Sequence, residues 1–215
     1  MRGWFKNNSY AGAGPSLTFN FFAFDDNGST GILLATDAAG TGINWYTWDG
    51  ANAVTGTAFA TGSDTGWHYA AATHASGSTN YEVYWRKDGA TSLGHSTLAV
   101  GSQLTAINKL WLGSDGFTEA VSNAAWRSWT VSSAVLTSAQ LLAESQSLLQ
   151  PSGSNLHFLA SVGSASAATN GGSGGSWTVN GTLASDEATE PEAGLFPSII
   201  QSASYRVARN TLIRL

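Results

Sequence analysis

Short segments rich in apolar and aromatic residues, each closed by turn-forming residues, follow one another along most of this chain. Residues 16–24 alternate polar and apolar side chains at their start, and a polar turn at 25–29 leads into a returning segment at 31–35. A period of two is typical of half-buried strands, and Asp, Asn and Gly between two such segments favour a hairpin. The pattern predicts antiparallel strands here, and it recurs at 43–48, 54–59, 67–73, 81–86, 91–100, 109–113 and 124–131.

One segment departs from the strand pattern. Thr137 and Gln140 have the spacing of a capping box, which marks the start of a helix, and Pro151 marks its end. We predict a short helix over about 137–149 that covers one end of the core. Its apolar stripe would consist of Leu141, Leu142, Leu148 and Leu149.

The last third of the chain changes in composition. Two late strands are expected within about 156–183, on either side of a connection rich in Ser, Ala and Gly. Residues 186–192 carry four acids and no base, whereas 198–215 carry three arginines and no acid. We therefore expect one domain over 1–185, and an acidic linker with a basic C-terminal arm over 186–215. The arm's arginines, which could dock on a neighbouring subunit, are Arg206, Arg209 and Arg214.

Composition excludes several kinds of partner and site. Charged residues make up 11% of the chain and the formal net charge is −5, which argues against broad binding to nucleic acid. The chain has no Cys, so it has neither disulfides nor Cys-ligated zinc. No segment has the length of a membrane helix, and residues 1–30 lack the pattern of a signal peptide.

Several segments, taken in order, resemble laminin-G-like domains of the concanavalin A-like lectin and glucanase superfamily. Residues 65–73 read Thr-Gly-Trp-His-Tyr-Ala-Ala-Ala-Thr and are similar to the family's Gly-x-Trp-His-x-Val-Ala-x-Thr strand. Residues 81–89 resemble its Leu-x-Leu-Tyr-Val-Asp-Gly strand and turn, and 110–113 its Leu-x-Ile-Gly strand. Residues 126–131 resemble its closing strand and residues 136–141 its short helix, so the resemblance covers about 1–150.

The resemblance implies an all-β fold in which two antiparallel sheets form a jelly-roll sandwich of the concanavalin-like type. One short helix on the C-terminal side and an extended C-terminal arm would complete it. Family members usually open with one strand ahead of the strand that resembles residues 2–6. A sheet edge is therefore expected to lack its cover, and the arm or a neighbouring chain could supply it.

Glycoside hydrolases share this superfamily, but the chain lacks their sequence signature. Retaining hydrolysis needs two carboxylates close together, and no Glu-x-Asp-x-x-Glu segment occurs. Glu82 and Glu119 are the two Glu residues ahead of the expected helix, and neither has an acid two positions away. The protein is therefore expected not to be an enzyme. The histidines are expected to make structural hydrogen bonds, namely His68, His74, His95 and His157.

Two groups of residues are candidates for binding. Asp25, Asp26, Asn27 and Asp115 could supply oxygen ligands to Ca²⁺, although Asp and Asn beside Gly are also ordinary turn residues. No cofactor is required by the sequence, and calcium is the one that these loops could hold. Trp45, Tyr46, Trp48 and Trp85 could stack on sugar rings, with a place in the core as the competing explanation for each. The tryptophans expected in the core are Trp67, Trp111 and Trp126.

These observations favour a non-catalytic carbohydrate-binding or adhesion module displayed on a virion or cell surface. The alternative is a structural or decoration protein of a phage particle or surface filament that assembles through its terminal arm. The expected partners are glycans or neighbouring protein subunits, in a homo-oligomer or a larger assembly. An extracellular or virion-surface location is expected.

Overall fold

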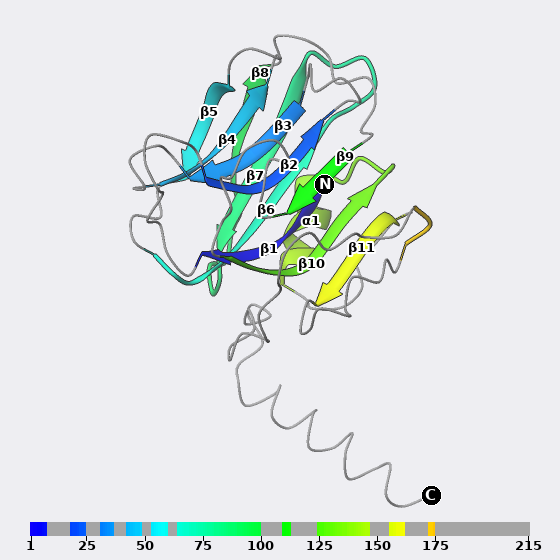
Figure 1. Cartoon of the computed structure of the whole chain (residues 1–215). Coiled ribbons are helices and arrows are strands. Elements are labelled where there is room, and N and C mark those ends of the chain that lie inside the picture. Colours follow the sequence, from blue (N-terminus) through cyan, green and yellow to red (C-terminus); the bar gives the residue numbers. More distant parts are fainter. Residues whose placement is uncertain are drawn as a thin grey trace, which may run out of the picture.

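The computed structural model describes residues 1–7, 18–24, 31–36, 42–48, 53–59, 64–99, 109–112, 124–146, 155–161 and 172–174. Within these ranges the chain forms antiparallel strands and one short helix, so the prediction of a mostly β fold is confirmed (Figure 1).

Six strands form the first sheet, in the order β11, β10, β1, β6, β7 and β8, and all neighbours are antiparallel. Strand β1 lies between β10 and β6, so it is inside this sheet and not at its edge. The bounds are β1 Arg2–Asn7, β6 Trp67–Thr73, β7 Asn80–Lys87, β8 Gly94–Ala99, β10 Ala124–Ser132 and β11 Asn155–Ser161.

Five strands form the second sheet, in the order β5, β4, β3, β2 and β9, again with antiparallel neighbours. Every residue of β3 is buried, which means that both faces of this strand are covered. The bounds are β2 Thr18–Phe24, β3 Gly31–Thr36, β4 Ile43–Trp48, β5 Ala53–Phe59 and β9 Lys109–Leu112.

Side chains from both sheets meet in one buried cluster. Phe5 and Trp129 come from the six-stranded sheet, and Leu34 and Trp45 come from the five-stranded sheet. Each is at most 1% exposed. Because side chains alternate between the faces of a strand, alternate residues of several strands can fill this space together. The other members are Ile32, Ile43, Ala70, Ala72, Tyr81, Val83 and Leu98.

A local irregularity places Trp129 in this cluster. Arg2 pairs with Thr130 and Trp4 pairs with Arg127, so two residues of β10 lie opposite Gly3. One of those two, Ser128, has φ +53°, a backbone conformation that is uncommon for a residue other than glycine. An added Cβ at Gly3 would lie 2.6 Å from Cγ of Trp129. The indole therefore packs directly on the glycine backbone.

The other face of the six-stranded sheet carries a second cluster, and helix α1 (Ser138–Ser145) packs on it. We expected the helix to cover one end of the core, but its buried Leu141 contacts this separate cluster. The physical reason is alternation, because β1, β6 and β7 also present aromatic residues on the face turned away from the first cluster. The members are Trp4, Trp67, Tyr69, Ala71, Tyr84, Leu136 and Leu141.

Two buried arginines hold the helix against the sheet. Nε of Arg2 donates to Oε1 of Glu144 at 2.5 Å, and Nη1 of Arg86 donates to the carbonyl of Ser145. The predicted capping box is confirmed. The backbone N–H of Gln140 donates to Oγ1 of Thr137, and the backbone N–H of Thr137 donates to the side-chain Oε1 of Gln140. Residues of the sheet thus hold the C-terminal end of α1, whereas Thr137 and Gln140 of the helix segment cap its N-terminal end.

The predicted segments agree with the structure to within a few residues where it describes them. The strands expected at 43–48 and 67–73 have those bounds, whereas the strand expected at 91–100 begins only at Gly94 and is described as far as Ala99. The helix is described over Ser138–Ser145, and Leu148 and Leu149 lie outside the described residues. The second late strand and the segment 186–215, with Arg206, Arg209 and Arg214, also lie outside them.

Helix α1, the one helix in the described part of the chain, is not long and apolar enough to cross a membrane.

Candidate functional site

The four aromatic residues proposed as sugar platforms differ sharply in exposure. Trp45 is fully buried in the cluster between the sheets, so it cannot stack on a ligand in this fold. Tyr46 is 5% exposed, and its hydroxyl accepts a hydrogen bond from the side chain of Asn44 at 3.0 Å. The side chain of Trp48 lies outside the described residues, whereas Trp85 is partly exposed. Trp85 is therefore the described member of this group that a ligand could reach.

Trp67, Trp111 and Trp126 were expected in the core. Trp67 is 7% exposed but belongs to the cluster under α1, on the opposite face of the sheet from the main cluster. Trp126 is partly buried and packs against the main cluster. Trp111 is also partly buried.

The indole of Trp85 lies directly over Gly94, its partner across β7 and β8. An added Cβ at Gly94 would lie 2.3 Å from both Cε2 and Nε1 of Trp85. The ring also packs against the edge of the main cluster. Since a side chain at position 94 would push the indole away, the glycine fixes where the ring lies.

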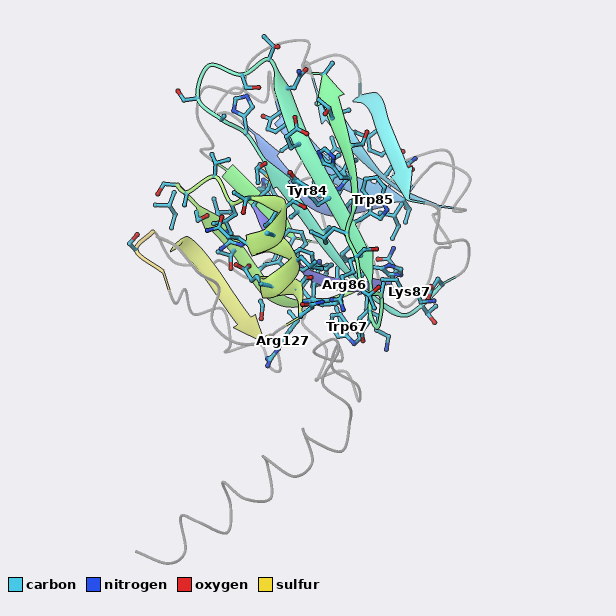
Figure 2. The ribbon with its side chains drawn as sticks, turned by 180° about the vertical axis from the view of Figure 1, so that it is seen from behind. Trp67, Tyr84, Trp85, Arg86, Lys87 and Arg127 are labelled. Carbon is cyan, nitrogen blue, oxygen red and sulfur yellow. The ribbon has the colours of Figure 1, made fainter. Side chains whose placement is uncertain are left out.

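A group of polar residues lies beside Trp85, and we call it the polar end. It consists of Asn7, Asp64, His68 and Lys87, which come from β1, from the segment before β6, from β6 and from β7. His68 and Lys87 are directly paired across β6 and β7, and Phe5, two residues from Asn7, is paired with His68. Lys87 follows Trp85 by two residues, so both point to the same face of β7 (Figure 2).

Asp64 joins the members of the polar end. Its Oδ2 lies 2.5 Å from Nζ of Lys87 and 3.9 Å from Nε2 of His68, and its Oδ1 accepts from the amide of Gly66 at 2.8 Å. The hydrogen bond from Lys87 is the main reason that the pKa of Asp64 lies below its usual value. The pair is accessible, since Lys87 is 61% and Asp64 22% exposed in their side chains. It therefore presents ammonium donors and carboxylate acceptors together.

His68 and Asn7 form the buried side of the polar end. The His68 ring stacks on Phe5 with 5.7 Å between centroids, and burial lowers its pKa to about 4, against an opposing effect of Asp64. His68 is thus neutral at pH 7. Asn7 is 2% exposed, and neither its amide nitrogen nor its amide oxygen has a hydrogen-bond partner among the described residues. Buried amides are nearly always bonded, so the Asn7 side chain requires a partner beyond the described residues.

A different polar group occupies the opposite face of β7 and β8. Nε2 of His95 lies 2.6 Å from Oε2 of Glu82, and the hydroxyl of Thr97 donates to the same oxygen at 3.0 Å. His95 also stacks on Tyr84 with 4.7 Å between centroids. The Thr97 hydroxyl bonds to Glu82 and not to His95, so this arrangement does not activate a hydroxyl as a nucleophile. These contacts are ordinary cross-strand pairs on an exposed face.

Metal binding stays a prediction. Asp25, Asp26, Asn27 and Asp115 lie outside the described residues. Within the described ranges, no three His, Cys, Asp or Glu side chains come together in a way that could hold a metal ion.

Sequence reasoning did not single out Asn7, Asp64, Lys87 or Gly94 as site residues. Asp64 and Lys87 lie close to glycines in turn-like sequence, and the register of β6 and β7 is what brings Lys87 to the end of the sheet near Asp64. That register was open to prediction, because the hairpin connection between Thr73 and Asn80 is short. No sequence signal marked Asn7 or Gly94.

Comparison of the chain with protein-family models, with curated proteins and with solved structures found no match.

Proposed function

We propose that this chain is a non-catalytic glycan-binding or adhesion module, built as a laminin-G-like sandwich, that binds sugar at the polar end and Trp85. The partly exposed Trp85 ring over Gly94, on the same face of β7 as Lys87 with its partner Asp64, carries the proposal. A ring of this kind can cover the apolar C–H face of a pyranose. The adjacent ammonium and carboxylate groups supply donors and acceptors for neighbouring sugar hydroxyls.

This chemistry favours neutral pyranosides. Lys87 and Asp64 neutralise each other at 2.5 Å, so the site offers no uncompensated charge to an ionised sugar. The resemblance of residues 65–73 and 126–141 to laminin-G-like domains supports the same class of function. The proposal includes display of this chain on a virion or cell surface. The chain would bind there to a glycan carried by a second surface.

A glycan array probed with the full chain tests the proposal, followed by calorimetric titration of the strongest hit. Trp85→Ala should weaken binding by about tenfold or more, as loss of a central aromatic contact does. Gly94→Ala keeps the indole but displaces it, so it should weaken binding while circular dichroism shows an intact fold. Thr97→Ala on the opposite face of the same strands is the matched control and should bind like the wild type.

Two results would reject the proposal. One is an array without hits for a protein that is folded and monodisperse. The other is an affinity that Trp85→Ala and Gly94→Ala leave unchanged, because sugar would then bind elsewhere.

The alternative, an assembling structural protein, is favoured by one observation. Val135 and Leu156 are 53% and 41% exposed, and both lie near the end of the β10 and β11 pair, where Ser132 faces Asn155. Exposed apolar side chains beside an edge strand suit a contact between subunits. Light scattering coupled to size-exclusion chromatography distinguishes the two functions. An assembly that Leu156→Ser dissolves would support the alternative, whereas a stable monomer would exclude it.

A further inference from the structure

Two buried side chains beneath α1 have hydrogen-bonding groups that nothing in the described part of the chain satisfies. Tyr69 on β6 and Arg86 on β7 are directly paired across the two strands, and each is 2% exposed. The hydroxyl of Tyr69 and Nη2 of Arg86 are buried without a hydrogen-bond partner among the described residues. Residues paired in this way have Cβ atoms about 5 Å apart, so the two side chains start from one face of the sheet. Arg86 and Tyr69 also act on each other electrostatically.

The remaining contacts of Arg86 fix its position. Nε donates to the carbonyl of Ala90 at 2.6 Å, and Nη1 donates to the carbonyl of Ser145 at the end of α1 (Figure 2). Its Cζ lies 5.5 Å from the centre of the Trp4 ring, which itself contacts Tyr69 with 5.6 Å between centroids. Trp4 thus lies against both residues, and Nη2 has no freedom to turn toward solvent.

Charge in this region is not balanced by the described residues. Arg2 and Arg86 are both 2% exposed, and Glu144 forms an ion pair with Arg2 at 2.5 Å. No carboxylate of the described residues lies within ion-pair distance of Arg86. Asp88 acts on Arg86 from farther away and is partly exposed. Among the described residues, Arg86 therefore keeps a buried positive charge that no close carboxylate offsets, which is costly in a protein interior.

The chemistry of the two groups selects the kind of ligand. Burial, and after it the carboxylate of Glu144, raises the pKa of Tyr69 well above its usual value against the opposing charges of Arg2 and Arg86, so its hydroxyl stays neutral and can donate a hydrogen bond. Nη2 of Arg86 can only donate. A water molecule would accept from both but would not offset the charge. An anion would do both.

We propose that Tyr69 and Arg86 form a buried site for a small monovalent anion such as chloride, held beneath α1 by the phenol hydroxyl and the guanidinium. This site is separate from the polar end and does not depend on glycan binding. The anion would link β6 and β7 to the end of α1 and would stabilise the packing of the helix on the sheet.

Thermal unfolding of the full chain in sodium gluconate, with bromide or chloride substituted at constant ionic strength, tests the site. Bound halide should raise the Tm of the wild type along a saturating curve. The rise should reach roughly 3–6 °C when the halide concentration is ten times Kd. Tyr69→Phe should reduce the response by about half or more, since it removes one of the two donors.

Tyr81→Phe is the matched control. Tyr81 is also a buried tyrosine whose hydroxyl has no partner among the described residues, but it belongs to the cluster between the sheets. Its variant should keep the full halide response. A wild type whose Tm does not respond to halide would overturn the proposal and leave water at the site, and so would a Tyr69→Phe variant with an undiminished response. An anomalous bromide peak between Tyr69 and Arg86 in crystals would confirm it directly.

Discussion

Replacing Gly3 by alanine is the sharpest test of how Trp129 packs on β1. An added Cβ would lie 2.6 Å from both Cγ and Cδ2 of Trp129, and 2.8 Å from its Cα. Real Cβ contacts essentially never fall below 3.0 Å. A rotation of the Trp129 side chain cannot relieve the contact with Cα, so β1 and β10 must move apart in the middle of the sheet.

The cost can be worked out from these contacts. Overpacking a well-packed core costs about 1–3 kcal/mol, and the backbone contact places Gly3→Ala near 3 kcal/mol. Replacing glycine also restricts the unfolded chain, which returns about 0.5–1 kcal/mol of stability. The expected net loss is about 2 kcal/mol, which corresponds to a fall in Tm of about 4–8 °C for a chain of this size. Urea denaturation and thermal unfolding, both followed by far-UV circular dichroism, would measure it.

Gly77→Ala is the control for this experiment. Gly77 has φ +78° and nothing within 4 Å of an added Cβ. Its replacement by alanine therefore causes no clash, and the positive φ alone should lower the free energy of unfolding by about 1 kcal/mol. It should also leave the near-UV spectrum of the tryptophans unchanged, whereas Gly3→Ala should alter it. If Gly3→Ala proves less destabilising than Gly77→Ala, the described packing of Trp129 on β1 is incorrect.

Three further predictions concern the helix and the polar end. Thr137→Ala removes the N-cap of α1 and should cost about 1 kcal/mol in urea denaturation; no loss would mean that the capping box does not stabilise the fold. Glu144→Gln leaves the buried Arg2 without its carboxylate and should cost about 3 kcal/mol, whereas Glu82→Gln in an exposed pair should cost less than about 1 kcal/mol. The folded-state pKa of His68 is lowered from 6.5 to about 4, so unfolded chains bind a proton first as the pH falls. The free energy of unfolding should therefore fall by up to about 3 kcal/mol between pH 6.5 and 4. In His68→Phe the free energy of unfolding should change less between pH 6.5 and 4. The same pH dependence as in the wild type would show that His68 is not the group responsible.

Much of the secondary structure could be predicted from the sequence, because local alternation and turn chemistry determine it. Residues 43–48 and 67–73 show a strand composition closed by turn residues, and those bounds hold in the structure. The capping box of Thr137 and Gln140 is a contact within one helical turn, so it could be read from spacing alone. Information of this kind lies within a few residues along the chain.

The site could be predicted only in part. Trp85 was a candidate from composition and chain position, and it is partly exposed, whereas Trp45 was an equal candidate and is fully buried. Alternation shows that Trp45 and Tyr46 point to opposite faces of β4, but not that both of those faces are covered. Exposure depends on which other segments pack there.

By itself, the sequence determined where strands and a helix form, and that the fold must hold together without disulfides. Only the tertiary structure decided which tryptophans are enclosed, which strand edges meet, and that α1 covers the back of the six-stranded sheet. It also placed His68 beside Lys87 and Tyr69 beside Arg86. These contacts join residues far apart in the chain, and they form because the sheets must bury both of their apolar faces, a requirement that no single segment can express.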